Sequence, residues 1–245
     1  MMPDSLVLCY HAVSPRWSAP LSVTPEALER QLTWFVERGW HGSTFREAVL
    51  GSPGGRTLVV SFDDAFLSVL ELAHPILASL GLVGTVFAPT AFMSSRQCLR
   101  WPGIERWLDT PFAPELTGMC WRDLGTLADA GWEIGSHTRS HPTLTRLPAE
   151  TLREELLGSR IELERHLNRS CSSIAYPYGA VDARVAASAG KAGYAAGAAL
   201  ASRLAHDGPL RWPRVGVYQV DTWPRFRLKA SRPIRYARRS RLFGR

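Results

Sequence analysis

Two adjacent carboxylates, Asp63 and Asp64, come directly after the apolar run Thr57–Phe62. A β-branched run of this kind predicts a buried strand, so both acids lie at its carboxyl end. Burying two like charges is costly without a cation or hydrogen-bond donors, so we do not expect them to serve packing. They could cap the helix that follows, or they could do chemistry as a general base and a metal ligand.

Two histidines, His137 and His141, follow a second predicted strand at Trp132–Gly135. If residues 137–141 form one helical turn, the two imidazoles face the same side. Two neutral imidazoles and one carboxylate bind a divalent ion such as Zn²⁺ and leave positions open for substrate. A solvated helix face would also explain an isolated H-x-x-x-H. The place of this one at a strand end favours a metal site.

Strand and helix patterns alternate along the chain, which predicts parallel strands covered by helices, in a barrel or a doubly wound sheet. In both folds the carboxyl ends of the strands gather on one side, so the acids and the histidines should meet there. Residues 91–120 break the alternation with tryptophans and prolines, and we interpret them as a long loop that lines a binding site. The patterns predict strands over 5–10, 57–62, 83–87, 132–135, 173–176 and 194–200, and helices from Thr24 to about 39 and over 66–80, 121–130, 148–167 and 182–192.

Two further segments end predicted strands. His11 follows Val7-Leu8-Cys9-Tyr10, and Tyr176-Pro177-Tyr178-Gly179 follows the strand that ends at Ala175. A lone histidine is often structural, and proline with glycine marks a tight turn. Both segments nevertheless fall at the same rim as the acids and the histidine pair.

These motifs together resemble the polysaccharide deacetylases, carbohydrate esterase family 4 with its chitooligosaccharide deacetylase homology domain. Ser61-Phe62-Asp63-Asp64 is similar to the first motif of that family, His137–His141 to the second and Tyr176–Gly179 to the third. The resemblance covers about residues 5–220. It implies a single-domain, distorted (β/α)7 barrel. It also implies a metal-dependent hydrolase that removes N-acetyl groups from an amino-sugar glycan or glycan precursor.

The resemblance also implies residue roles. Asp63 would be the general base, and the backbone N–H of Tyr178 would help to hold the oxyanion, with Tyr176 and Pro177 beside it at the substrate. The protein ligands of a divalent ion, zinc or else cobalt, nickel or manganese, would be Asp64, His137 and His141.

The chain departs from the family pattern at two places. Ala175 stands where the family usually carries an arginine that tethers the base, and we expect Arg214 to supply that cation from a later strand. The late motif with a catalytic histidine is absent. The N-terminal Tyr10-His11 resembles a subgroup in which this strand is permuted to the start, so His11 would be the general acid. His206, in a polar turn, is the poorer candidate.

The composition is that of a soluble globular protein, with 45% apolar and 21% charged residues among 245. The start of the chain shows no signal-peptide pattern and no segment is long and apolar enough to span a membrane, so we expect a cytoplasmic protein. The net charge of +7 is concentrated at the end. Nine of the 29 basic residues and none of the 22 acidic ones lie in residues 225–245, so the rest of the chain carries −2.

We therefore divide the chain into a barrel over residues 1–224 and a basic tail over 225–245. Such a tail, with apolar residues between its cations, could hold the protein at the inner face of a membrane or near a lipid-linked substrate. A solvated terminus explains it equally well. We find no nucleic-acid-binding motif.

Two other functions fit parts of the pattern. A non-catalytic carbohydrate-binding barrel that keeps the metal site would explain Ala175, and a two-histidine, one-carboxylate iron site would suit an oxygenase. The oxygenase leaves Asp63 unexplained, whereas a hydrolase needs a base. The four cysteines form no C-x-x-C pair, and we interpret them as packing residues.

Overall fold

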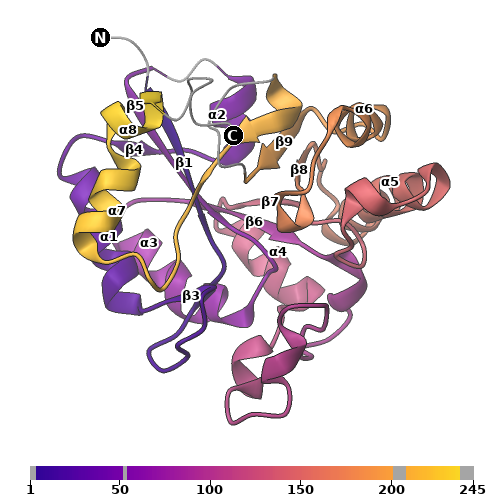
Figure 1. The fold of residues 1–245 in the computed structure, drawn as a ribbon, viewed down its shortest axis with the longest axis horizontal. Helices are drawn as coiled ribbons and strands as arrows, with labels where there is room; N and C mark the ends of the chain where they lie inside the picture. Colours follow the sequence, from indigo (N-terminus) through magenta and orange to yellow (C-terminus); the bar gives the residue numbers. More distant parts are fainter. Residues whose placement is uncertain (1–3, 52–53, 201–207, 238–245) are drawn as a thin grey trace.

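The core of the protein is a sheet of parallel strands, seen at the centre of Figure 1 with helices around it. The computed structural model describes residues 4–51, 54–200 and 208–237. Neighbouring strands in the sheet follow the order β9-β8-β7-β6-β5-β1. Their bounds are β1 Asp4–Tyr10, β5 Arg56–Phe62, β6 Gly84–Ala88, β7 Glu133–Ser136, β8 Ser173–Ala175 and β9 Ala196–Ala199.

One late segment completes the barrel. Its first half, β10 (Trp212–Pro213), pairs with β9, and its second half, β11 (Val215–Gly216), pairs with β1 on the far side of the sheet. Arg214 is the residue between the two halves, and its N–H donates to Ala199 O at 3.1 Å. The sheet is therefore nearly closed into the predicted distorted (β/α)7 barrel. The sequence analysis placed Arg214 on a later strand but gave no bounds for it, because each half of the closing segment spans only two residues.

Helices cover the outside of the barrel as predicted. Thr24 caps the first of them by accepting from Ala27 N–H, and Pro25 occupies its first turn. The predicted helix over 66–80 is confirmed over residues 67–79, with a π-helical turn at Val69–Ala73 before α3. The helix bounds are α1 Pro25–Val36, α2 Phe45–Leu50, α3 His74–Ser79, α4 Trp121–Asp129, α5 Ala149–Leu167 and α6 Ala183–Lys191, and a short strand β4 (His41–Gly42) pairs with the start of β5.

Alternate residues of each strand face two different cores, because successive side chains of a strand point to opposite faces. In β1, Leu6, Leu8 and Tyr10 pack in the large core between sheet and helices. Val7 belongs instead to a small core inside the barrel, together with Val59, Phe87 and the alanines of β8 and β9. The inner core is small. Cys9 follows Val7 on the inward face of β1, Ser61 follows Val59 on the inward face of β5, and both fill the barrel interior toward the carboxyl ends of the strands.

Two connections rise beyond the carboxyl ends of the strands. One joins β2 (Ala12–Val13) to β3 (Ser22–Val23), and the other is the predicted insertion between β6 and α4, which projects at the bottom of Figure 1. The insertion contains the short helical turns Thr90–Phe92, Glu105–Trp107 and Ala113–Leu116, and Leu99, Trp101 and Ile104 are buried in it. The insertion is thus a packed substructure at the carboxyl end of the barrel, where the sequence predicted the acids and histidines.

Much of the predicted basic tail belongs to the barrel's outer layer. Helices α7 (Trp223–Ala230) and α8 (Arg232–Ala237) lie on the α1 side, where Phe226 packs against Phe35 and is buried. Arg235 is 2% exposed and pairs with Asp4 of β1 at 2.8 Å. The predicted boundary at residue 224 therefore falls inside a helix, and residues 238–245 lie outside the described residues.

The described cations of this segment have partners within the protein. Arg225 and Lys229 pair with Asp221, and Arg227 lies over the rings of Trp34 and Trp223. These contacts give the segment a structural role, and its contact with lipid stays a prediction. No helix among the described residues has the length and apolar character needed to cross a membrane.

Replacing Phe226 tests whether this segment stabilises the barrel. Phe226→Ala should lower the free energy of unfolding by about 3–5 kcal/mol, since it leaves a cavity against Phe35. Leu228→Ala is the matched control, because Leu228 is 59% exposed on the same helix and should change stability by less than about 0.5 kcal/mol. Urea denaturation followed by circular dichroism measures both. Equal stability of the two variants would show that α7 adds little to the fold.

Candidate active site

The pairing of β1 with β5 brings the first motif beside the N-terminal histidine. Cys9 is in register with Ser61, and the N–H of Asp63 donates to Tyr10 O at 3.0 Å. Cys9 and His11 therefore continue the inward face of β1, and Ser61 and Asp63 continue the inward face of β5. All four side chains are buried, at the carboxyl end of the barrel interior.

Arg214 reaches Asp63 from the closing segment. Its two terminal nitrogens donate to the two carboxylate oxygens at 2.7 and 2.8 Å, and one of them also donates to Ser61 Oγ at 3.2 Å. The guanidinium lies 5.4 Å from the ring of Phe87 and is 1% exposed. The predicted pairing of Arg214 with Asp63 is therefore present, in the two-pronged geometry that suits arginine and carboxylate.

This ion pair decides the charge of Asp63. Burial acts to raise its pKa, but the guanidinium of Arg214 and the imidazole of His137 hold that pKa at about 2, below the ordinary 3.8. Burial acts to lower the pKa of Arg214, and the carboxylate of Asp63 raises it. Both groups are therefore charged at neutral pH.

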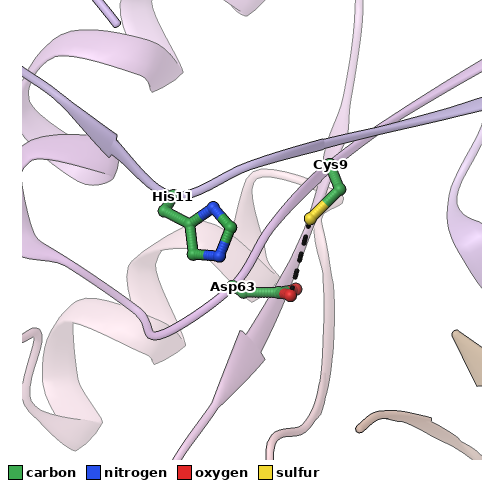
Figure 2. Close-up of side chains that lie close together, drawn as sticks. All are labelled: Cys9, His11 and Asp63. Atoms are coloured by element: carbon green, nitrogen blue, oxygen red, sulfur yellow. Dashed lines mark hydrogen bonds between the residues drawn. The ribbon is translucent and has the colours of Figure 1, made fainter. Parts of the chain in front are cut away.

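Cys9 lies against the same carboxylate, as Figure 2 shows. Its Sγ is 3.5 Å from Asp63 Oδ2, and burial raises the pKa of the thiol well above its ordinary value. Cys9 is thus a protonated donor to Asp63. The residue was interpreted from sequence as packing, but its place two residues before His11 on one strand would have predicted a common face.

Cys9, His11 and Asp63 bring one possible ligand atom each within 4.8 Å of one another. We do not assign a metal to this group, because Arg214 occupies both oxygens of Asp63 and the thiol keeps its proton. A cation there would have to displace a buried guanidinium. His11 lines the pocket described below, faces Tyr218 at a ring distance of 6.5 Å, and has a pKa lowered by burial.

The second group of possible ligands consists of Asp64, His137 and His141, whose ligand atoms also lie within 4.8 Å of one another. The Nε2 atoms of both histidines are 3.3 Å from Asp64 Oδ1. Burial acts to raise the pKa of Asp64, but the two imidazoles hold it well below its ordinary range. Burial lowers the pKa of His141, whereas for His137 the carboxylates of Asp63 and Asp64 outweigh burial and raise it.

The donor set of this group fits a divalent cation. His137 Nδ1 lies 2.8 Å from the carbonyl of Ala175, which can only accept, so this nitrogen carries the proton. In the neutral ring, Nε2 therefore presents its lone pair to Asp64 Oδ1, a buried oxygen without a hydrogen-bond partner. A nitrogen lone pair facing a carboxylate is unfavourable unless a cation or a proton lies between them, and two imidazoles with one carboxylate are typical of zinc sites.

The histidines do not lie on a helical turn, and that prediction was wrong. Residues 137–141 form an irregular loop in which Thr138 and His141 have positive φ values of 67° and 61°. The carboxylate of Glu155 on α5 holds the loop by accepting from Arg139 N–H, Ser140 N–H and the Ser140 hydroxyl, at 2.6–2.9 Å. A tertiary hydrogen-bond network thus replaces the i,i+4 spacing of a helix, and the sequence gave no sign of Glu155.

The ring of His141 is supported by stacking. Its Nδ1 is buried and has no hydrogen-bond partner among the described residues, in contrast to Nδ1 of His137. The ring stacks on Trp101 of the insertion at 4.2 Å, with 22° between the planes, and meets the edge of Tyr178 at 4.7 Å. The insertion therefore contributes directly to the orientation of a candidate metal ligand.

The third motif contributes one side chain to the site. Tyr178, with φ of 58°, is half exposed and donates from its hydroxyl to Pro102 O. Gly179 also has positive φ, and a Cβ there would lie 2.7 Å from Leu200 O, so only glycine fits. Tyr176 and Pro177 do not line the pocket, contrary to expectation, because Tyr176 is fully buried and its hydroxyl donates to Leu210 O.

A pocket of about 360 Å³ opens over both aspartates and the three histidines. Its remaining wall comes from the β2–β3 connection, the insertion, the third motif and Tyr218. The predicted site residues His11, Asp63, Asp64, His137, His141 and Tyr178 all line it, whereas Arg214 lies beneath Asp63. The poorer candidate His206 lies outside the described residues. The lining also includes Trp17, Pro20, Trp101, Pro102, Arg106, Trp107 and Gly179.

The candidate cation ligands and the buried ion pair thus lie together at the carboxyl ends of the strands of a parallel α/β barrel. The sequence profile of the polysaccharide deacetylases matches residues 51–197, more than half of the chain, so the chain belongs to the polysaccharide deacetylase family. The match includes all three motifs, and with them Asp63, His137 and Tyr178.

A curated relative is the Bacillus subtilis (strain 168) protein named "Putative polysaccharide deacetylase YxkH", 23% identical over 196 residues. The match covers 78% of this chain and 62% of YxkH, so the chain spans about three fifths of that relative's length.

Two solved structures share the fold. The Streptococcus pyogenes deacetylase PplD, solved with acetate, is 19% identical with a TM-score of 0.76, covering 92% of this chain and 97% of PplD. A de-N-acetylase of Aggregatibacter actinomycetemcomitans is 16% identical with a TM-score of 0.75, covering 92% and 99%.

Removing Arg214 tests the buried ion pair. In chelator-treated protein at pH 7, Arg214→Met should lower the free energy of unfolding by roughly 3–5 kcal/mol, because Asp63 becomes an unpaired buried charge. The difference in stability between wild type and variant should shrink as pH falls from 7 to 4 and below. Burial without Arg214 raises the pKa of Asp63, so the variant relieves its buried charge by protonation in this range, whereas the wild type keeps the stabilisation from its depressed pKa until pH falls below about 4 toward 2.

The matched control is Arg153→Met, which breaks an exposed pair with Glu150. Since both of those side chains are more than 60% exposed, the change should leave the free energy of unfolding almost unchanged at either pH. Urea denaturation at pH 7 and pH 4 gives both values. A deficit for Arg214→Met that does not depend on pH would contradict the assignment.

Proposed function

We propose that this protein is a divalent-cation-dependent hydrolase that removes N-acetyl groups from an amino-sugar glycan or glycan precursor. The observation that carries the proposal is the pairing of Asp63 with Arg214 beside the Asp64, His137 and His141 group, within one pocket. One carboxylate is thereby held away from the cation site while its neighbour takes part in it. Hydrolysis needs this division, because it requires both a cation and a separate base.

The cation would be held by Asp64 and by the Nε2 atoms of His137 and His141, and zinc suits this set, with cobalt, nickel and manganese as alternatives. When bound, it would polarise the acetamide carbonyl and make a water molecule more acidic. The hydrogen bond from His137 Nδ1 to Ala175 fixes the tautomer that leaves Nε2 free for this purpose.

Asp63 is the proposed base. Its low pKa keeps it ionised, and Arg214 with Cys9 fixes its orientation, so it can accept a proton from the attacking water as the new C–O bond forms. The oxyanion that develops on the acetamide oxygen needs a hydrogen-bond donor, for which we propose the backbone N–H of Tyr178.

His11 is the proposed acid. Its ring nitrogen lies within 4.8 Å of an Asp63 oxygen, and its burial makes it neutral in the resting site. It can therefore take over the proton from Asp63 and deliver it to the sugar nitrogen as the C–N bond breaks. The products are then acetic acid and the free amine, which exchange a proton to give acetate and the ammonium form, so that atoms and charges balance.

Arg214 supports a catalytic role over a non-catalytic carbohydrate-binding barrel. Ala175, in the place of the family's arginine, was the strongest argument for lost turnover, and Arg214 supplies the missing guanidinium from another strand. PplD was solved with acetate, the product that this reaction would release. An oxygenase would leave the pairing of Asp63 with Arg214 without a purpose.

Three substitutions separate cation binding from turnover. Asp64→Asn should lose the cation, whereas Asp63→Asn and His11→Ala should keep it and lose activity by about 10²–10⁴-fold, the usual contribution of general acid–base catalysis. Acetate release from N-acetylated sugars, with and without EDTA, and metal content by mass spectrometry are the two measurements. Loss of metal in all three variants, or full activity in His11→Ala, would refute these roles.

Trp101 offers a test of how the cation is held. Trp101→Leu should weaken zinc affinity by roughly 10–100-fold, since the stacking that orients His141 is lost. Trp107→Leu is the matched control, because Trp107 belongs to the same insertion but meets the rings of Trp17 and Phe112 edge-on and contacts no histidine ring. Competition with a chelator measures the dissociation constants. Equal weakening in both variants would indicate a general effect of the insertion.

A further inference from the structure

The rim of the pocket is formed by separate segments that contact one another. The β2–β3 connection carries Trp17 and Pro20, the insertion carries Trp101 and Trp107, and the third motif and the stretch after β11 add Tyr178 and Tyr218. At about 360 Å³, the pocket is at the small end of the range for small-molecule sites. The contacts between the segments decide whether a long chain could cross it.

The first contact joins the β2–β3 connection to the insertion. Trp17, which is 2% exposed, meets the ring of Trp107 edge-on at 5.8 Å. Beside it, Arg16 Nε donates to Glu115 Oε1 at 2.7 Å. An apolar and a charged contact thus connect two walls that are about 90 residues apart in the sequence.

Two more contacts continue around the rim. The hydroxyl of Tyr178 donates to Pro102 O at 3.1 Å and so joins the third motif to the insertion. On the opposite flank, Gln219 N–H donates to Pro20 O at 3.1 Å and joins the stretch after β11 to the β2–β3 connection. The insertion and the β2–β3 connection are therefore each fixed on two flanks.

We propose that this site takes an acetylated amino sugar at the end of a glycan, or in a small saccharide conjugate, and does not act on sugars in the interior of a polymer. The inference rests on the proposed deacetylase function. An interior sugar has glycan on both sides, so the chain must leave the site in two directions. Among the described residues, the three contacts join four segments of the rim, and Leu200 lines the remaining flank, between Gly179 and Tyr218. The rest of the glycan would leave over that flank.

The site also favours a single sugar ring by its depth. Asp63 and Asp64 are 3% and 2% exposed at the pocket floor, below the aromatic rims. The acetamide must reach this floor. The sugar that carries it therefore has to enter between Trp107 of the insertion and Tyr178 of the third motif. A terminal ring can do so along its own axis, whereas an interior ring would bring its two neighbours against Trp107 and Tyr178.

The experiment compares N-acetylglucosamine and its oligomers of two to six sugars, with the reducing end labelled by ¹⁸O. Acetate release measures turnover, and fragment-ion mass spectrometry locates the deacetylated sugar. We expect one terminal sugar to lose its acetyl group in every oligomer, at a rate that changes less than about threefold with length. Removal of interior acetyl groups first would overturn the inference and leave the deacetylase function standing. Absence of acetate release from every length, together with N-acetylgalactosamine and N-acetylmannosamine, would refute both.

A second experiment breaks the contact between the β2–β3 connection and the insertion. The double variant Arg16→Ala/Glu115→Ala, at two residues outside the pocket lining, should keep terminal deacetylation within about threefold and add interior products. Arg16 is 64% exposed and Glu115 is 12% exposed, and removing both leaves no unpaired charge, so the double variant should fold. Glu150→Ala/Arg153→Ala removes an exposed pair on α5, outside the pocket lining, and should leave the product pattern unchanged. A purely terminal pattern in a folded, opened variant would overturn the role of this contact and the proposal with it.

Discussion

The site depends on one buried ion pair, between Arg214 and Asp63. Taking two charges out of water is costly, and the cost is offset only if the geometry satisfies both groups. Here both carboxylate oxygens are paired, and Ser61 and Cys9 add further hydrogen bonds. Arg214 is also the residue at which β10 gives way to β11, so the barrel closes at the point where the base is held. The same residue therefore completes both the barrel and the environment of Asp63.

This pair gives two adjacent carboxylates different chemistry. Asp63 and Asp64 are neighbours in the chain, but Asp63 faces a guanidinium inside the barrel, while Asp64, with φ of 72°, turns toward two imidazoles. Each carboxylate stays ionised because it has its own positive or polar partners. The proposed cation site consequently has the proposed base beside it, and Arg214 holds that base so that it does not compete for the cation.

The histidine pair is positioned by parts of the protein that have no chemistry of their own. Glu155 holds the backbone of the loop from α5, and Trp101 holds the ring of His141 from the insertion. The insertion also forms a wall of the pocket, so the same residues can affect both cation affinity and the choice of substrate.

The sequence by itself determined the alternation of strands and helices, the strand ends that carry the acids and histidines, and the family. These features follow from local patterns, since a β-branched run or a capped amphipathic stretch is specified within 5–20 residues. Asp63, Asp64, His137 and His141 were found because they stand directly after such runs. Arg214 was found by asking which cation could replace the arginine missing at Ala175.

Tertiary structure alone decided the rest. The closing strands are too short to show a pattern, the loop at 137–141 owes its shape to Glu155 rather than to helical spacing, and Tyr176 turned out to be a core residue. The high positive charge of α7 and α8 predicted a tail rather than packed helices. Their packing depends on contacts such as that of buried Arg235 with Asp4, which lies 231 residues away. In each case the deciding partner is remote in the sequence, and a contact between remote residues leaves no mark on the local pattern of either one.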